Sequence, residues 1–226
     1  MAQTVKGVIF DLDGTVLDTE SFPLAVWPEV SRKRGYPASE ELAGRLVGIN
    51  EADEREILRV EFGAAYPYDE VRDEIDALFR EKVERDGIAV KKGFGELLEH
   101  IKTLTLPYAL ATSTSRKIIG WKLTCAGLTD VFPLIVCGDE VENGKPAPDM
   151  FLKAARLMGQ NPEDCIGIED SPAGLRGLCG AGIRSVFIKD LITPSADVIT
   201  DVWRECRNLG EVRPLLDVCT TDNSYR

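Results

Sequence analysis

Hydrophobic residues along the chain gather in short, nearly continuous runs that alternate with amphipathic stretches. The runs predicted to form strands are residues 5–10, 108–111, 134–137, 165–168 and 185–188. Strands covered on both faces show this pattern, as in parallel sheets flanked by helices. Between the runs, hydrophobic residues recur three or four positions apart, as in Leu97, Ile101 and Leu104, which predicts helices with one apolar face. The alternation predicts a doubly wound α/β fold with a parallel sheet.

Residues 18–90 interrupt this alternation. They contain helical stripes such as Val71, Ile75, Leu78 and Phe79, but no convincing strand. A chain of 226 residues is long enough for an α/β domain and a smaller appended one. We therefore predict an α/β core made of residues 1–17 and 91–226, and a small inserted helical domain made of residues 18–90.

The composition of the chain limits which partners it is expected to bind and in which cellular compartment it is expected to be found. The formal net charge is −11 and no basic face is evident, so binding to nucleic acid or to an anionic membrane surface is not expected. The six cysteines are scattered without a Cys-x-x-Cys pair, which is typical of reduced thiols in the cytosol. No hydrophobic run approaches the length of a membrane span, and no signal-peptide core precedes the first strand. We expect a cytoplasmic protein, with a monomer as the simplest assembly.

The strongest chemical signal is the segment Asp11-Leu12-Asp13-Gly14-Thr15, which follows the first predicted strand directly. Open α/β sheets bind their ligands at the carboxyl ends of the strands. Two carboxylates two residues apart can divide the work of phosphate transfer, because one can attack phosphorus while the other supplies a proton to the leaving oxygen. Taken alone, the segment is equally compatible with a strand end and a turn.

The second and third predicted strands also lead into polar residues. The second is followed by Thr112-Ser113-Thr114-Ser115, whose hydroxyl and N–H groups at a helix start could hold phosphate oxygens. An ordinary helix cap is the alternative. The third is followed by Lys145 in a Gly-Lys-Pro segment, where an ammonium could neutralise carboxylates and a phosphoryl group. A lone lysine is usually solvated surface, so this segment gains weight only from the other strand ends.

The fourth predicted strand ends in two adjacent acids, Glu169 and Asp170. Acidic side chains are costly at the end of a buried strand unless they are paired or bound to a metal. Together with Asp11 they would form an oxygen-only site, which suits the hard cation Mg²⁺ better than zinc. A helix cap by Asp170 is the alternative, since Ser171-Pro172 is expected to begin a helix directly afterwards.

Taken together, Asp11-x-Asp13-Gly14-Thr15, Thr112, Lys145 in Gly-Lys-Pro and Glu169-Asp170 resemble the four sequential motifs of the haloacid-dehalogenase superfamily. The resemblance extends from Val5 to about Ile188. The helical insertion resembles the cap of the branch that contains β-phosphoglucomutase and many small phosphatases. The resemblance implies a Rossmann-like catalytic core with a small helical cap, and a magnesium-dependent enzyme acting on a small phosphorylated metabolite.

The same resemblance implies a role for each catalytic residue. Asp11 is expected to be the nucleophile that becomes transiently phosphorylated, and Asp13 the general acid and base. Thr112 is expected to hydrogen-bond the transferring phosphoryl group, with Ser113 contributing its backbone N–H. Lys145 is expected to bind this group as well and to balance its charge.

The resemblance also implies the ligands of the metal. We expect Mg²⁺ to be held by Asp11, Asp13 through its backbone carbonyl, Glu169 and Asp170. Phosphoryl transfer depends mostly on positioning and on stabilising charge at the equatorial oxygens, which Mg²⁺ and a lysine can supply. The expected ligand set therefore agrees with the chemistry.

Two activities within this branch compete. A β-phosphoglucomutase must hold a second phosphate, and the family typically places a histidine near the first cap turn and an arginine after a Gly-x-Ser/Thr stretch. This chain has Pro23 and Glu51 at these places, the latter after Gly48-Ile49-Asn50, although Arg45 or Arg55 could serve in a shifted alignment. We therefore expect hydrolysis of a small phosphomonoester, such as a sugar phosphate. Mutase activity is one alternative, and a non-catalytic binding or regulatory protein on the same fold is another.

Overall fold

The computed structural model describes residues 4–46, 51–191 and 194–220. Gly48-Ile49-Asn50, used above in the comparison with mutases, lie outside the described residues. The chain divides into two compact units, Met1–Asp18 with Ala89–Arg226, and Thr19–Ile88. Asp18 and Val90 thus belong to the first unit. The two segments in which the chain leaves and re-enters this unit, around residues 17–18 and 89–90, pair with each other. The N–H of Asp18 donates to the carbonyl of Ala89 at 2.9 Å, and Leu17 forms an antiparallel bridge with Val90.

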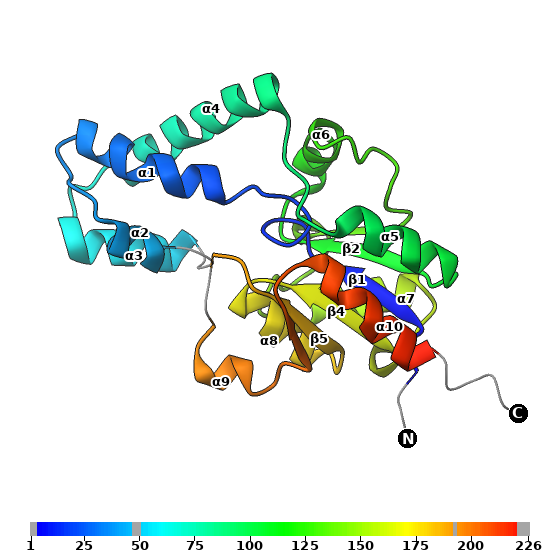
Figure 1. Ribbon diagram of the computed structural model, residues 1–226. Coiled ribbons are helices and arrows are strands. Elements are labelled where there is room, and N and C mark those ends of the chain that lie inside the picture. Colours follow the sequence, from blue (N-terminus) through cyan, green and yellow to red (C-terminus); the bar gives the residue numbers. More distant parts are fainter. Residues whose placement is uncertain (1–3, 47–50, 192–193, 221–226) are drawn as a thin grey trace, which may run out of the picture. The chain divides into compact units, whose positions relative to one another are not determined.

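The larger unit is built on a six-stranded parallel sheet (Figure 1). Its strands are β1 (Gly7–Phe10), β2 (Tyr108–Thr112), β3 (Ile135–Cys137), β4 (Cys165–Glu169), β5 (Arg184–Ile188) and β6 (Arg204–Cys206), in the spatial order β3-β2-β1-β4-β5-β6. The predicted doubly wound α/β fold is confirmed, and the five predicted hydrophobic runs all form strands. The sixth strand was not predicted, because this edge strand is short and has exposed Arg204 and Glu205 before buried Cys206.

The order of the strands reverses beside β1. The chain proceeds outward from β1 through β2 to β3, and then crosses back to place β4 on the other side of β1. Phe10 at the end of β1 pairs with Ile168 near the end of β4, so the carboxyl ends of the two strands lie level. Doubly wound sheets form their ligand crevice at such a point, where the segments after adjacent strands part to opposite sides.

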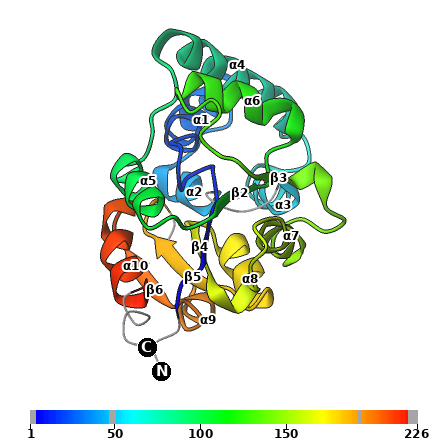
Figure 2. The ribbon, with the colours of Figure 1, turned by 90° about the vertical axis from the view of Figure 1, so that its right-hand side faces the viewer.

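Helices cover both faces of the sheet (Figure 2). The helices of this unit are α5 (Phe94–Thr103), α6 (Arg116–Cys125), α7 (Asp149–Leu157), α8 (Pro172–Gly180), α9 (Ala196–Ile199) and α10 (Arg213–Thr220), with 3-10 turns at Gly138–Glu140, Pro162–Asp164 and Leu209–Val212. The apolar side of α7 is buried at Phe151, Ala154 and Ala155 against β1, β2 and β3. On the other face, Phe10 packs edge-on against Phe94 of α5, with ring centroids 5.7 Å apart. Burial on both faces explains the continuous hydrophobic runs.

The smaller unit, Thr19–Ile88, contains the helices α1 (Ser21–Lys33), α2 (Glu40–Arg45), α3 (Glu51–Phe62) and α4 (Tyr68–Asp86). Val71 and Ile75 of the predicted stripe are buried in its core beside Trp27, whose indole N–H donates to the hydroxyl of Tyr66 at 3.2 Å. Ser31 also contacts this hydroxyl, at 2.9 Å, so the polar groups in this core have hydrogen-bond partners.

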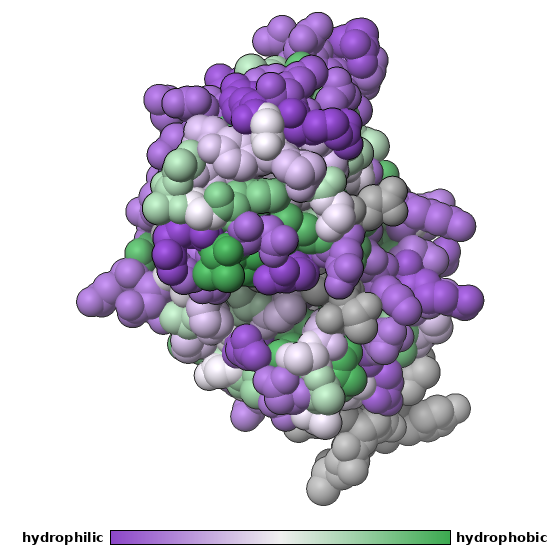
Figure 3. All heavy atoms as spheres, turned by 90° about the vertical axis from the view of Figure 1, so that its left-hand side faces the viewer, coloured by the Kyte–Doolittle hydropathy of each residue, from purple (hydrophilic) through white to green (hydrophobic). Residues whose placement is uncertain are grey.

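Hydrophilic side chains cover much of the molecular face shown in Figure 3, with hydrophobic ones between them. Within the described ranges, no helix has the length and apolar character needed to cross a membrane.

Candidate active site

The loop after β1 is pinned to the end of β4. The N–H of Asp11 donates to the carbonyl of Ile168 at 3.0 Å, and the hydroxyl of Thr15 donates to a carboxylate oxygen of Asp170 at 2.6 Å. Gly14 adopts a φ of +85°, and a Cβ added there would lie 2.2 Å from Asp170 Oδ2. Only glycine satisfies both the left-handed backbone and this close approach. The spacing Asp-x-Asp-Gly-Thr therefore has a steric reason as well as a chemical one.

Lys145 joins the first and fourth strand ends. Its ammonium donates to Oδ1 of Asp11, and to Oε1 of Glu169 at 2.7 Å. The lysine side chain is only 6% exposed, and both carboxylates are buried. A buried ammonium is tolerated when carboxylates compensate its lost hydration. The geometry therefore excludes the alternative in which Lys145 is an ordinary solvated surface lysine.

The electrostatic balance of this cluster is unfavourable for ionised Asp11. Burial raises the pKa of Asp11, Lys145 opposes this rise, and the neighbouring carboxylates of Glu169 and Asp13 add to it, so that the pKa reaches about 8. Burial alone would lower the pKa of Lys145, but the attraction of Asp11 and Glu169 outweighs burial and raises it, so the lysine stays protonated. A further positive charge beside Asp11 would favour the carboxylate form that a nucleophile needs.

Asp11, Glu169 and Asp170 form a group of three buried acids whose ligand oxygens all lie within 4.8 Å of one another. When ionised, these acids outnumber the single ammonium of Lys145, so the local charge is negative. Oxygen-only ligands of this kind fit a hard divalent cation. The carboxylate of Asp13 is not part of this group, and its expected contribution through the backbone carbonyl stays a prediction.

Glu169 is held by the start of α8. Its Oε2 accepts hydrogen bonds from the N–H of Ser171 at 2.7 Å and from the Ser171 hydroxyl at 2.9 Å. The same hydroxyl oxygen accepts from the N–H of Gly174 at 3.0 Å, which caps the helix as Ser171-Pro172 predicted. Both oxygens of Glu169 are thus engaged, one by Lys145 and one by the helix start. The helix cap belongs to Ser171, not to Asp170, so the capping alternative for Asp170 is wrong.

A methyl group at Gly174 is expected to disturb this arrangement. A Cβ at this position would lie 1.7 Å from Glu169 Oε1, and that carboxylate is anchored by Lys145 and Ser171, so it cannot move without losing a partner. We expect Gly174→Ala to reduce stability by about 1–3 kcal/mol, as overpacking of a tight site does, and to reduce activity. Thermal denaturation and an activity assay would measure both effects.

Gly180→Ala is the matched control for this prediction. Gly180 ends the same helix, and an added Cβ there would meet nothing closer than Pro148 Cβ at 3.6 Å, an ordinary contact. If the two variants had equal stability and activity, the proposed rigidity of Glu169 would be contradicted.

The hydroxyl-rich loop after β2 lies beside Asp13. Thr112 is fully buried, and its Oγ1 accepts a hydrogen bond from the N–H of Thr114 at 3.0 Å and lies 3.5 Å from Asp13 Oδ2. The Thr114 hydroxyl donates to the same Asp13 oxygen at 2.6 Å. Ser113 has an exposed side chain, and a Cβ added at Gly138 would lie 2.5 Å from its carbonyl oxygen. The turn after β3 therefore supports this loop at close range.

Lys122 contacts the site but was not found by sequence reasoning. Its ammonium lies 2.5 Å from Asp13 Oδ1 and 3.0 Å from the hydroxyl oxygen of Thr114. Lys122 follows buried Ile119 by three residues and precedes buried Leu123, so it lies on the buried side of α6. A lysine within an apolar helical stripe is the signal that could have identified it.

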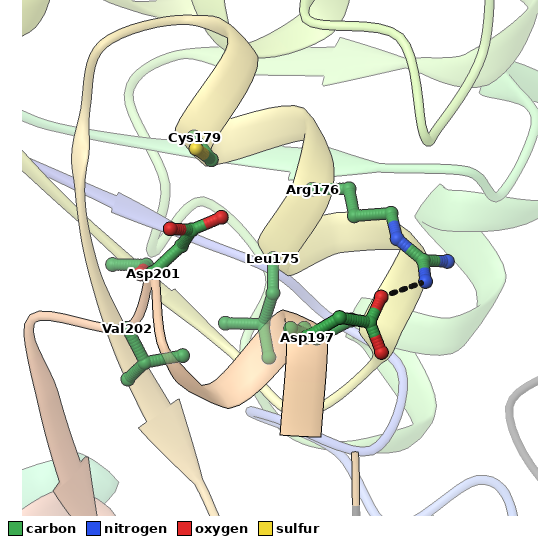
Figure 4. Close-up of a pocket in the computed structure, with 8 residues that line it drawn as sticks. Leu175, Arg176, Cys179, Asp197, Asp201 and Val202 are labelled. Carbon is green, nitrogen blue, oxygen red and sulfur yellow. Dashed lines mark hydrogen bonds and ion pairs between the residues drawn. The ribbon is translucent and has the colours of Figure 1, made fainter. Parts of the chain in front are cut away.

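Apart from Ser113, which is exposed, the predicted residues thus form two groups at the carboxyl ends of β1, β2 and β4. One contains Asp11, Lys145, Glu169 and Asp170, and the other contains Asp13, Thr112 and, unpredicted, Lys122. A cavity of about 160 Å³ lies elsewhere, between α8, β5 and α9 (Figure 4). None of these residues lines the cavity. Two of the residues that do line it, Arg176 and Asp197, form an ion pair at 3.0 Å.

Comparisons with known proteins identify relatives that act on phosphorylated compounds. A family model described as haloacid dehalogenase-like hydrolase matches residues 5–182, a range that includes every predicted site residue. A phosphorylated carbohydrates phosphatase of Thermotoga maritima is 31% identical over 190 residues, covering 81% of this chain and 84% of that protein. A β-phosphoglucomutase of Bacillus subtilis is 31% identical over 194 residues, covering 81% and 83%. The crystal structure of a hydrolase of the same family from Deinococcus radiodurans R1, with bound phosphate and sodium, matches with a TM-score of 0.79 at 25% identity, covering 96% of this chain and 97% of that one.

Proposed function

Because this chain belongs to the haloacid dehalogenase-like hydrolases, we propose that it is a magnesium-dependent phosphatase that hydrolyses a small phosphomonoester through an aspartyl-phosphate intermediate. The family resemblance inferred from the four motifs is confirmed, and the chain is an enzyme of the phosphoric monoester hydrolase class. The observation that carries the proposal is the buried cluster of Asp11, Lys145 and Glu169 beside Asp170, at the point where the strand order reverses.

The proposed reaction has two steps. In the first, a carboxylate oxygen of Asp11 attacks phosphorus, the bond between phosphorus and the ester oxygen breaks, and Asp13 gives its proton to that oxygen. In the second, Asp13 takes a proton from water, the water oxygen attacks phosphorus, and phosphate leaves with Asp11 restored. Thr112, the N–H of Ser113 and Lys145 are proposed to hold the phosphoryl oxygens throughout.

Asp11, Glu169, Asp170 and the carbonyl of Asp13 are proposed to hold Mg²⁺. When bound, the ion would supply charge stabilisation to the phosphoryl oxygens and keep Asp11 ionised. The raised pKa of Asp11 supports this assignment, since Lys145 alone leaves that pKa at about 8. A single cation from the protein is insufficient for a nucleophile that must be ionised near neutral pH.

We prefer hydrolysis over mutase activity because the arginines of the smaller unit that could bind a second phosphate are already paired with carboxylates. Arg55 donates to Glu51 at 2.7 Å and also pairs with Asp69, while Arg45 lies 3.5 Å from Glu61. These exposed ion pairs are individually weak. Even so, a second phosphate group could bind Arg55 only by displacing the carboxylates of Glu51 and Asp69, and this displacement would weaken phosphate binding. The name of the Thermotoga relative supports a sugar phosphate as the substrate.

The test is phosphate release from a panel of sugar phosphates, nucleotides and other phosphomonoesters, measured with Mg²⁺ and with chelator. A parallel assay would follow isomerisation of β-glucose 1-phosphate with a bisphosphate activator. We expect release that requires Mg²⁺ and exceeds isomerisation. Removing the metal should decrease release by well over tenfold, because two effects combine. With a pKa of about 8 only about a tenth of Asp11 is ionised at neutral pH, and the charge stabilisation of the phosphoryl oxygens is lost as well.

The other outcomes distinguish the alternatives. Isomerisation faster than release would assign a phosphomutase, as in the Bacillus relative. Release that is undiminished by chelator would contradict the metal assignment. Binding of phosphorylated compounds without turnover would favour a non-catalytic protein on this fold.

A further inference from the structure

Lys122 is an ammonium on the buried side of α6 that contacts the expected acid/base residue. We propose that Lys122 is a positioning residue which, with Thr114, holds the carboxylate of Asp13 in the orientation required for proton transfer. The inference rests on the proposed function, because a positioned acid/base is needed only if the reaction moves a proton. It assigns to α6 a part in the reaction that none of the four motifs contains.

The contacts around Asp13 engage both carboxylate oxygens. Lys122 Nζ donates to Oδ1 at 2.5 Å, and Thr114 Oγ1 donates to Oδ2 at 2.6 Å. Lys122 also donates to Thr114 Oγ1 at 3.0 Å, so the three side chains form a closed ring of hydrogen bonds. A carboxyl group held at both oxygens by groups that also bind each other has little freedom to rotate. The ring can persist when Asp13 carries the proton of the first step, because the Thr114 hydroxyl can then accept where it otherwise donates. The ring therefore fixes the plane of the Asp13 carboxylate.

The burial of Lys122 indicates that this contact is more than a chance surface pair. Its side chain is 16% exposed, and that of Asp13 is 24% exposed. Lys122 lies on the same side of α6 as buried Ile119 and Leu123, whereas Lys117 of the same helix is exposed. An ammonium on a buried helix face loses hydration, and this cost is tolerated where a carboxylate compensates it. Asp13 supplies that carboxylate.

The position of the ring predicts which kinetic constant changes. Asp13 Oδ2 lies 3.5 Å from the hydroxyl oxygen of Thr112, which is proposed to hold the phosphoryl group. Lys122 itself contacts Asp13 and Thr114, and Lys145 is separately held by Asp11 and Glu169. Removing Lys122 should therefore disturb proton transfer and leave binding of the phosphoryl group largely unchanged. The effect should appear in kcat and not in KM.

The first test compares Lys122→Met with Lys117→Met, a matched control on the same helix. Both variants would be assayed with the best alkyl phosphate of the panel and with p-nitrophenyl phosphate, whose leaving group needs little protonation. We expect Lys122→Met to lower kcat for the alkyl ester by about tenfold or more, a part of the usual acid/base contribution. The loss for the aryl ester should be smaller, and KM should stay within about twofold. Lys122→Arg, which keeps a cationic donor, should recover much of the loss.

The second test uses the Asp13→Ala background. Asp13→Ala should itself lose more activity with the alkyl ester than with the aryl ester. If Lys122 acts only through Asp13, adding Lys122→Met to Asp13→Ala should cost less than about twofold further. Thr114→Val removes the other donor and should give an alkyl-selective loss of its own, so the proposal remains testable if Lys122→Met does not fold.

The outcomes separate this inference from the proposed function. A wild-type protein without phosphatase activity would overturn both. If the wild type and Asp13→Ala behave as expected but Lys122→Met matches Lys117→Met, the positioning role alone is wrong. Equal losses for alkyl and aryl esters, or full additivity with Asp13→Ala, would also overturn it, because they indicate a general structural effect.

Discussion

Replacing Asp11 by asparagine is expected to reduce phosphate release by at least about 10⁴-fold while the protein remains folded. The amide has the shape of the carboxylate but cannot attack phosphorus. The protein should tolerate it, because burial already raises the pKa of Asp11 to about 8, so the site accommodates an uncharged group near neutral pH. Lys145 also keeps Glu169 as a partner at 2.7 Å. Phosphate release with Mg²⁺ and thermal denaturation followed by circular dichroism would measure the two effects.

Asp197→Asn is the matched control for this substitution. Asp197 belongs to the same α/β unit, but it is exposed and pairs with Arg176 beside the separate cavity shown in Figure 4. This variant should retain wild-type turnover. Activity of Asp11→Asn within about tenfold of the wild type would remove Asp11 as the nucleophile, since loss of a covalent nucleophile costs far more.

Replacing Lys145 by methionine is expected to affect both activity and stability. The ammonium lies between Asp11 and Glu169 with 6% of its side chain exposed, so its removal leaves buried carboxylates without compensation. Breaking such a pair costs about 3–5 kcal/mol of stability. The loss of stability should be larger in chelator than in Mg²⁺, because a cation bound to the same carboxylates would replace part of the missing charge. Thermal denaturation in both conditions, together with phosphate release, would measure these effects.

Lys117→Met controls for the loss of a lysine from the same unit. Lys117 is exposed on α6 and lies outside the proposed site. It should change neither stability nor turnover appreciably, since surface substitutions of this kind fall within about 0.5 kcal/mol. If Lys145→Met were as stable and active as this control, the cluster would have neither the electrostatic nor the catalytic importance assigned to it.

The two largest predictions concern opposite charges in one cluster. Asp11 must be ionised to react, yet its surroundings favour the protonated form, and Lys145 corrects only part of this imbalance. The need for a second cation thus follows from the burial of the site. The same burial strengthens each charge–charge interaction at the reacting group by lowering the local dielectric.

Local sequence patterns were sufficient for much of the fold. Runs such as Val8-Ile9-Phe10 are hydrophobic throughout because helices cover both faces of their strand, so the pattern reflects burial directly. The start of α8 at Ser171-Pro172 was predictable because a cap depends on neighbouring residues. Strand β6 was missed, since Arg204 and Glu205 are exposed at the sheet edge and nothing in their order distinguishes a strand from a loop.

The candidate site was predictable in its residue types but not in its contacts. The four motifs identified Asp11, Lys145 and Asp170 as residues of interest, because the chemistry requires carboxylates and a lysine at strand ends. Lys122 was missed, because its helix appears in sequence as an ordinary amphipathic segment and Asp13 lies 109 positions away. The contact between Lys122 and Asp13 can be recognised only in the folded structure, where α6 lies beside the loop after β1.

The sequence by itself determined the class of fold, the positions of five of the six strands along the chain, and the chemical character of the first four strand ends. These depend on local hydrophobicity, on helix caps and on residue types, all of which a single chain displays. Only the tertiary structure decided the spatial order of the strands and the ion pairs of the site. Thr15 and Asp170 are 155 positions apart, and Asp11 and Lys145 are 134 apart. Such pairings arise from sheet topology and side-chain packing, which no local pattern specifies.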